Sequence, residues 1–372
     1  MYEIAVLTAF DFRSAEYRDL FARSAATAFQ HPIWLSAFYD LLVSPRGAEP
    51  VIVTVRDRDS RLVCVLPLVR RRYGPMRVIE FADLAVTDYA APIAEPGVFP
   101  ALLADRSVRA RIRKAIKPFD LIRIAKVPDG APAMDQLLGL SGHLPMPTSA
   151  HSTPLDLPFE QWREQRLNPS FRKELDRKSR QLGRKGDVRF GTCPDAETIR
   201  STVEAMREYR RPRFAEEGGD LLHLPDYLEF YLRVATEGIG GLVRTYALTI
   251  DGRPIAATLG LAHRGHFLVL LCGFDLAGFK NYSVGALTFD HIARDCIERG
   301  DTLLDFTIGD ESYKTLFGAE TSPMWMSLGS GSPVGVLAQT AIVQLPWARN
   351  MAKRVAAAYR PAKPLALPQP GG

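Results

Sequence analysis

The stretch GDESYKTLFG at residues 309–318 follows an apolar run, TLLDFTI, at residues 302–308. The β-branched and aromatic residues of the run predict a strand, and the glycine after it predicts where that strand ends. Two acids, a tyrosine and a lysine then follow between Asp310 and Lys314. Two interpretations are open: a surface turn into a short helix, or the wall of a substrate site. The sequence around the stretch has to decide between them.

Three strands precede this stretch. They are predicted at 242–250, 255–262 and 266–274, where β-branched and aromatic residues are frequent. Asp-Gly at 251–252 and Arg-Gly at 264–265 are tight-turn sequences, so the strands form an antiparallel meander.

A helix is predicted next, at 285–299, and it starts just after Ser283. The first backbone N–H groups of a helix have no acceptor within it, and with the helix dipole they form an anion site suited to a pyrophosphate. Alternatively, Ser283 acts only as an N-cap. The candidate donors of such a site are the backbone amides of Ser283, Val284, Gly285, Ala286 and Leu287.

Residues 1–150 also alternate between strand-like and helix-like stretches. Strands are predicted at 4–7, 51–55, 61–69 and 120–126, and a helix at 34–42. Pro, Gly, Ser and His then crowd residues 139–154, which predicts a domain boundary. We therefore predict an N-terminal domain at 1–150, a C-terminal domain at 151–330, and a basic amphipathic helix with a Pro-rich tail at 331–372.

The composition is that of an ordinary globular protein. Of its 372 residues, 47% are hydrophobic and 24% are charged. The four cysteines lie far apart, so neither a disulfide framework nor a metal site is expected. The N-terminus carries an acid and no basic segment, and no apolar run is long enough to span a bilayer. We expect a cytoplasmic protein. Peripheral association with the inner membrane is the alternative.

Positive charge is concentrated in two segments. Residues 161–190 contain ten Lys/Arg and four Asp/Glu, a local charge of +6, whereas the whole chain carries only +5. No acid follows Glu320, and residues 333–360 combine apolar residues at near-helical spacing with Arg and Lys. The second segment therefore predicts peripheral contact with an anionic membrane, or packing against the body of the protein.

The first basic segment predicts a helix at 168–186. Asn168 is its expected cap, Pro169 fits the first helical position, and Gly186 is the expected left-handed stop. The cations of this helix, Arg172 and Arg177 among them, either bind a phosphorylated acceptor or are simply solvated.

The order of these elements resembles the GNAT acyltransferase fold, and the motifs resemble its CelD/BcsL-like branch. Chains of that branch carry two GNAT-like halves, as do the related FemAB-type transferases. The most specific match is Asp-x-x-x-Gly-Asp-x-x-Tyr-Lys at 305–314. Val284 stands where the branch usually has proline. The remaining motifs are FRKELDRKSRQL at 171–182, YALTIDGRPIAA at 246–257, SVG at 283–285 and, more loosely, HPIWL at 31–35, LPL at 66–68 and DY at 88–89.

This resemblance implies an α/β protein with two GNAT-like domains, each a mixed, mostly antiparallel sheet flanked by helices. It also implies acyl transfer from acyl-CoA, a co-substrate and not a bound cofactor, to an amine or hydroxyl group. Acceptors in the branch are often cell-envelope or exopolysaccharide precursors.

Acyl transfer to an amine requires that the reactants be held together, that a proton be removed, and that the oxyanion receive a donor. Lys314 is the candidate donor to the oxyanion or to a phosphate, and the FemAB-type resemblance implies a functional lysine in a similar position. Tyr313 is a proton donor to the leaving thiolate or a packing residue, and Asp305 lies in or beside the cleft. Asp310 and Glu311 either contact substrate or cap a helix. His223 is either a general base on the acceptor side or a structural histidine.

We therefore predict an acyl-CoA-dependent N-acyltransferase whose acceptor is an amino sugar in an anionic or phosphorylated envelope precursor. Three alternatives are open: a lipid N-acyltransferase for a long-chain, sphingoid-type amine; an aminoacyl-tRNA-dependent FemAB-type transferase; and a non-catalytic member that binds a polysaccharide-synthesis complex. A net charge of +5 is low for a tRNA binder, so no nucleic-acid partner is expected.

Overall fold

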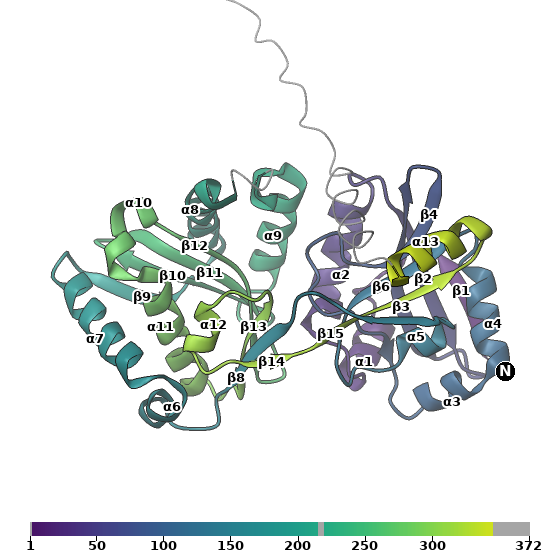
Figure 1. The fold of residues 1–372 in the computed structure, drawn as a ribbon, viewed down its shortest axis with the longest axis horizontal. Coiled ribbons are helices and arrows are strands. Elements are labelled where there is room, and N and C mark those ends of the chain that lie inside the picture. The colour runs from purple at the N-terminus through teal and green to yellow at the C-terminus, as the bar shows by residue number, and fades with distance from the viewer. Residues whose placement is uncertain (1, 215–218, 345–372) are drawn as a thin grey trace, which may run out of the picture.

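The chain folds into two lobes, each built on one sheet (Figure 1). The structure is a computed structural model that describes residues 2–214 and 219–344. Most neighbouring strands in both sheets are antiparallel, and helices flank both sheets. The predicted fold class, two mixed and mostly antiparallel sheets with flanking helices, is confirmed.

The first sheet has the order β1-β2-β3-β4-β6-β15-β7, and β5 pairs with β3 beside this path. Among its described strands, only β4 and β6 pair in parallel. Its strands are β1 (Glu3–Leu7), β2 (Glu49–Arg56), β3 (Leu62–Tyr73), β4 (Met76–Phe81), β5 (Ile93–Ala94), β6 (Leu121–Pro128), β7 (Gly142–Pro145) and β15 (Met324–Ser330). Its helical segments are α1 (Ala15–Arg23), η1 (Ala28–Gln30), α2 (Pro32–Phe38), η2 (Tyr39–Val43), α3 (Phe99–Ala104), α4 (Arg106–Ala115), α5 (Met134–Leu137) and α13 (Pro333–Gln344).

The second sheet has the order β14-β8-β13-β12-β11-β10-β9. The meander β10-β11-β12 is antiparallel as predicted, whereas β12 and β13 run parallel. Its strands are β8 (Ala150–Pro154), β9 (Val188–Thr192), β10 (Val243–Ile250), β11 (Arg253–His263), β12 (His266–Phe274), β13 (Leu303–Ile308) and β14 (Glu320–Ser322). Its helical segments are α6 (Phe159–Arg166), α7 (Pro169–Gly183), α8 (Ala196–Phe214), η3 (Leu221–His223), α9 (Pro225–Glu237), α10 (Leu276–Phe279), η4 (Lys280–Tyr282), α11 (Val284–Glu298) and α12 (Tyr313–Leu316).

The two faces of the second sheet bury different cores. One core holds apolar residues of α6, α7 and α11 together with Leu304 and Phe306 of β13. The other holds residues of α8 and α9 and is continuous with the core of the first domain. Successive side chains of a strand point to opposite faces, so Asp305 points toward the first domain while Leu304 and Phe306 point away from it.

Helix α9 joins the two domains. The rings of Trp34 on α2 and Phe230 on α9 meet edge to face at 4.9 Å, and both side chains are fully buried. Around them, Arg46 forms an ion pair with Asp226, and the Tyr227 hydroxyl donates to the Leu84 carbonyl at 2.7 Å. Since a buried aromatic side chain contributes several kcal/mol, this contact fixes the domains relative to each other.

The chain crosses between the domains twice. After β7 it enters the second sheet as β8, and after β14 it returns as β15, which pairs with both β6 and β7 of the first sheet. The sequence division at 151–330 had placed β15 in the C-terminal domain, so the structure differs from it in this strand. The reason is that β15 fills the space between two strands whose backbone groups are otherwise unpaired.

Helix α13 packs on β15 and β6, which is the packing alternative considered for the tail. Residues 345–360 of that predicted amphipathic segment lie outside the described residues. None of the described helices has an apolar stretch sufficient to cross a membrane.

Helix α7 begins as predicted and ends earlier. Asn168 accepts from the Ser170 amide, and Pro169 occupies the first helical position. The helix ends at Gly183, with Arg184 as a right-handed C-cap, and Gly186 does not have the left-handed conformation expected of a helix stop. Gly186 is instead required by close approach, because a Cβ there would lie 2.4 Å from a carboxylate oxygen of Asp251.

The position of α13 predicts a cost for enlarging Gly335. A Cβ at this residue would lie 1.6 Å from the carbonyl oxygen of Asp120. We expect Gly335→Ala to lower the free energy of unfolding by about 2 kcal/mol in urea denaturation, because the helix must move off the sheet. Gly183→Ala is the control, since a Cβ there would meet no atom within 4 Å. Equal stability of the two variants would contradict the packing of α13.

Candidate functional site

The central feature of the second sheet is the early separation of its two parallel strands. β12 and β13 pair only from His266 with Leu303 to Leu268 with Asp305. Beyond that point in the described chain, β12 pairs only with β11, and β13 pairs only with β8, its other neighbour from Leu303 onward. Among the described strands, none pairs with the edge of β12 that faces β13 from Val269 onward. This edge of β12 therefore has no described neighbouring strand beyond the pairs with β13, although the Val269 carbonyl accepts from Thr307.

Thr307 holds this separation in place. Its φ of 56° is left-handed, which is unusual and costly for a β-branched residue. The Thr307 hydroxyl donates to the carbonyl oxygen of Val269 at 3.0 Å, and the Thr307 amide donates to an Asp305 carboxylate oxygen at 2.7 Å. The β13–β8 register shifts between Asp305 and Ile308 at the same place.

The start of α11 provides unpaired amides close to this separation. Ser283 is left-handed, with φ 51°, and its side chain makes no capping hydrogen bond, so the N-cap reading of its hydroxyl is not what the structure shows. The amides of Val284, Gly285 and Ala286 belong to the first helical turn, where no helical acceptor exists. The Leu287 amide differs from the prediction: it donates to the Ser283 carbonyl at 3.0 Å and is not available to an anion.

Tyr313 connects α12 to α11. Its ring stacks on Phe289 of α11 with centroids 5.2 Å apart and meets the edge of Phe306 at 6.0 Å. The side chain is only half-buried. The tyrosine therefore lies on the α11 side of β13, opposite to the face toward which Asp305 points.

Lys314 is one of the most buried residues of the chain, with 2% of its surface exposed. Its ammonium group donates to the carbonyl oxygens of Gly309 at 2.8 Å and Thr307 at 3.3 Å, and it pairs with Glu311 at 3.0 Å. The segment that connects β13 to α12 therefore folds around the Lys314 ammonium group. The lysine side chain thus binds the main chain of the site.

Asp310 does not cap α12, whose N-cap is Ser312 without a side-chain bond. It contacts His151 of β8, with Oδ1 and Nε2 3.0 Å apart, and accepts from the Ser149 amide at 3.2 Å. The His151 bond is the main cause of the lowered pKa of Asp310. His151 is buried and was not predicted as a site residue; its place in the Pro/Gly/Ser/His-rich stretch suggested only a linker.

Asp305 bridges the two domains. The hydroxyl of Tyr89, which follows β4 in the first domain, lies 2.9 Å from both Asp305 carboxylate oxygens. Burial raises the pKa of Asp305 to about 6, although the bonds from Thr307 and Tyr89 oppose the shift. A carboxyl group with a pKa near neutrality can exchange a proton under physiological conditions.

A second charged group of the first domain lies beside Asp305. The Lys126 ammonium pairs with Asp83 at 2.9 Å and Asp88 at 3.6 Å, and it donates to the Thr87 carbonyl. Burial raises the pKa of Asp88, and Asp88 in turn helps to raise that of Asp305. Sequence reasoning missed Lys126 and Asp83, whereas the loosely matching Asp88-Tyr89 pair was the available signal.

The other predicted residues lie elsewhere. Arg172 and Arg177 are on α7, where they pair with Glu164 and Glu174. His223 is in η3 and accepts a hydrogen bond from Arg207 at 3.2 Å. Among residues 2–214 and 219–344, no group of three or more His, Cys, Asp or Glu side chains is arranged to hold a metal ion.

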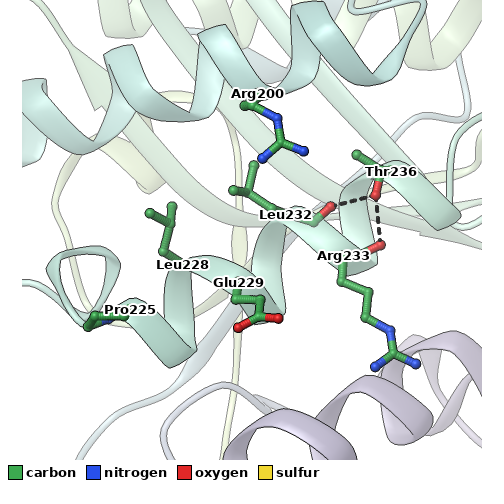
Figure 2. Close-up of a pocket in the computed structure, with 7 residues that line it drawn as sticks. All are labelled: Arg200, Pro225, Leu228, Glu229, Leu232, Arg233 and Thr236. Carbon is green, nitrogen blue, oxygen red and sulfur yellow. Dashed lines mark hydrogen bonds between the residues drawn. The ribbon is translucent and has the colours of Figure 1, made fainter.

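A pocket between α8 and α9 contains none of the predicted residues (Figure 2). Its volume is about 470 Å³. The Thr236 hydroxyl is bonded to the Leu232 and Arg233 carbonyls of its own helix, and Arg233 reaches α2 and η2, where it pairs with Asp40. Thr236 and Arg233 are therefore already used by the fold.

Comparison with known proteins agrees with this geometry. Residues 169–315 match the family model described as Acetyltransferase (GNAT) domain. No curated protein matches the sequence. The crystal structure of FemX is similar to this chain with a TM-score of 0.60 at 12% identity, covering 87% of this chain and 96% of that one.

Two further structures are similar as well. The C-terminal domain of a putative synthetase from Agrobacterium fabrum gives a TM-score of 0.53 at 13% identity, covering 90% of this chain and 96% of that one. The structure of L-PGS from Bacillus licheniformis gives 0.54 at 11% identity, covering 91% and 97%. The chain has a GNAT/FemAB-like double-GNAT fold, as the sequence resemblance implied. The residues that match the GNAT domain model lie within its second domain.

The raised pKa of Asp305 predicts how stability depends on pH. The folded chain binds a proton at this carboxyl more tightly than the unfolded chain, so the contribution to stability is present at acid pH and lost as pH rises through about 6. We expect Asp305→Asn to gain roughly 2 kcal/mol relative to the wild type between about pH 4 and pH 8 in urea denaturation.

Asp310→Asn is the matched control, because the pKa of Asp310 is lowered. Its carboxylate stabilises the fold above the ordinary carboxyl pKa, and this contribution is lost as pH falls. The Asp310 variant should therefore lose stability relative to the wild type as pH rises. The same sign for both variants would contradict the burial of Asp305.

Proposed function

We propose that the chain is an acyl-CoA-dependent N-acyltransferase that acylates an amino sugar of a cell-envelope or exopolysaccharide precursor. The observation that carries the proposal is the separation of β12 and β13 beside the unpaired amides of α11. An acyl-CoA donor has an extended arm with amide groups and a pyrophosphate, and this arrangement offers a partner for each.

The donor arm fits the open edge of β12. Extended ligands add to a sheet edge through main-chain hydrogen bonds, and β12 lacks a described strand partner on that side from Val269 onward. The pyrophosphate fits the N-terminus of α11, where the amides of Val284, Gly285 and Ala286 point out of the helix. Gly285 is suited to a close approach, since a Cβ there would already lie 3.0 Å from the Phe274 ring.

The acceptor fits the opposite face of β13, toward the first domain. Asp305, Asp83 and Asp88 outnumber Lys126 there, so the local charge favours a group that is cationic before reaction. A protonated amine meets that condition, and a phosphate does not. An envelope precursor that carries phosphate would therefore present its amino sugar here and its phosphate elsewhere.

The reaction then follows from these positions. Asp305 takes the first proton from the ammonium group, and the neutral nitrogen attacks the thioester carbonyl to form the C–N bond. The nitrogen then loses its second proton to solvent, and the C–S bond breaks. Tyr313, on the donor side, gives its proton to the leaving thiolate and recovers a proton from solvent. Lys314 is a positioning residue, because its ammonium group fixes the carbonyls of Thr307 and Gly309 on either side of the bend.

The names of the similar proteins support an acceptor from the cell envelope. Lysylphosphatidylglycerol is a membrane lipid, and one of the similar structures is the C-terminal domain of a putative lysylphosphatidylglycerol synthetase. At 11–13% identity the similar proteins share the fold with this chain, so the acceptor named here is our own proposal.

Transfer activity tests this proposal. We expect the protein to release free thiol from an acyl-CoA in the presence of an amino-sugar acceptor, and Asp305→Asn to lower kcat at least 100-fold, the lower range for loss of a general base. The pH profile of the wild type should rise through about 6, the pKa of Asp305. Acyl-CoAs of several chain lengths and both amino-sugar and sphingoid-type acceptors should be supplied.

Asp301→Asn is the control, since Asp301 is as buried as Asp305 but pairs with Arg244. It should retain most of the wild-type kcat. If the wild type released no thiol with any pair and acyl-CoA did not raise its melting temperature, the protein would be a binding member and the proposal would fail. Equal losses in both variants would remove Asp305 from the mechanism.

A lipid N-acyltransferase is the second candidate, and α13 is the observation that favours it. Val334, Val336 and Leu337 expose 54%, 51% and 73% of their surface on this helix, which contains no acid. Apolar side chains next to a basic segment are typical of peripheral membrane contact.

Binding to vesicles tests this second candidate. We expect Leu337→Glu to reduce co-sedimentation of the full chain with phosphatidylglycerol-containing vesicles about tenfold, because a carboxylate opposes insertion. Thr340→Glu adds the same charge at an exposed position of the same helix and should have a smaller effect. No sedimentation of the wild type would exclude the membrane contact.

A further inference from the structure

The predicted basic helix does not lie beside the acceptor face. α7 packs on α11 and η4, on the side of the second sheet that faces away from the first domain. A cavity of about 580 Å³ lies between α7 and η4. Its walls are Arg177, Lys178, Gln181, Arg184, Lys185, Asn281 and Tyr282.

Four of these seven side chains are cations and none is an acid. Glu174, next to the cavity, pairs with Arg177 at 2.6 Å and with Lys178 at 3.6 Å. No ion pair of Arg184 or Lys185 is found among residues 2–214 and 219–344. One carboxylate therefore faces four positive charges, and the excess positive charge is available to bind an anion.

The cavity is joined to the start of α11. The Lys178 ammonium donates to the Asn281 carbonyl in η4, and Ser283 follows η4 directly. The cations therefore continue the row of unpaired amides at Val284, Gly285 and Ala286. A ligand whose pyrophosphate lies at the helix start would bring its remaining phosphate and base into this cavity.

Tyr282 gives the cavity an aromatic wall. Its ring lies 5.9 Å from that of Phe279 and is half-buried. Aromatic side chains stack on nucleobases, and Arg and Lys bind phosphates. A volume of about 580 Å³ also lies in the range of small-molecule sites.

We propose that this cavity binds the nucleotide end of the thioester donor: Tyr282 contacts the base, and Arg184 and Lys185 contact a phosphate beyond the pyrophosphate. This rests on the proposed function and adds to it, because it assigns the basic helix to the donor and not to a phosphorylated acceptor. An RNA-borne donor is the competing ligand; the half-buried Tyr282 ring and a pocket lined by only seven residues match the size of one nucleotide.

Direct binding of CoA tests the inference without any acceptor or turnover. The probes are CoA and 3′-dephospho-CoA, measured by calorimetry on the full chain. We expect the double variant Arg184→Gln/Lys185→Gln to weaken CoA binding about tenfold and to leave binding of 3′-dephospho-CoA within about twofold, because the lost charges act on the phosphate that the second probe lacks. Binding of CoA to the wild type should weaken with added salt.

Lys173→Gln/Arg180→Gln is the matched control. It removes the same charge from exposed positions of the same helix that do not line the cavity. It should bind both probes as the wild type does, and both double variants should keep the wild-type melting temperature.

The outcomes separate this inference from the proposed function. Equal CoA affinity in all three proteins would overturn the inference and leave acyl transfer intact. Absence of CoA binding in the wild type would overturn both. Binding of tRNA by the wild type, lost in the cavity variant and accompanied by no CoA binding, would assign the cavity to an RNA donor and would also overturn the inference.

Discussion

The structure depends on two parallel strands that pair over three residue pairs and then separate. Parallel strands normally stay hydrogen-bonded along their length, so the separation needs a cause. Here the cause is the left-handed Thr307, whose hydroxyl is bonded to Val269 of the neighbouring strand and whose carbonyl is bonded to Lys314. A non-glycine residue in this conformation costs on the order of 1–3 kcal/mol. The buried lysine and the aromatic contacts of α12 offset that cost and keep the sheet open.

The separation also divides the site into two electrostatic sides. On the α11 side lie unpaired amides and the cations of α7. On the other side lie Asp83 and Asp88, paired with Lys126, and Asp305, bonded to Tyr89. Anionic and cationic reactants are thereby drawn to opposite faces of one strand. The first domain is essential to the acidic side, because it contributes Tyr89, Asp83, Asp88 and Lys126. This accounts for the extensive contact through α9, since a loose junction would not hold Tyr89 within hydrogen-bond distance of Asp305.

Much of the second domain could be predicted from local sequence. The meander, the start of α7 at Asn168 and the helix after Ser283 follow from turn, cap and periodicity signals, and the structure confirms them. The orientation of Lys314 and Asp310 could not be predicted, because both depend on tertiary partners: main-chain carbonyls for the lysine and His151 for the aspartate. Gly186 was expected to stop a helix, but its small size is needed for contact with Asp251, a residue more than sixty positions away. The return of β15 to the first sheet was missed for the same reason, since an edge to be filled is not visible in the strand's own sequence. For the candidate site, the C-terminal half was identified from its motif, whereas the half contributed by the first domain had only the weak Asp88-Tyr89 signal.

The central claim is that a thioester donor binds where β12 and β13 separate, with its phosphates at the start of α11. Hydrogen–deuterium exchange of the full chain with and without CoA measures this directly, because bound phosphate oxygens accept from amides that are otherwise open to solvent. The account predicts slower exchange in peptides that contain Val284, Gly285 and Ala286, with a smaller effect in peptides from the end of α7. Protection confined to the first domain, or no change at the start of α11 at saturating CoA, would contradict it.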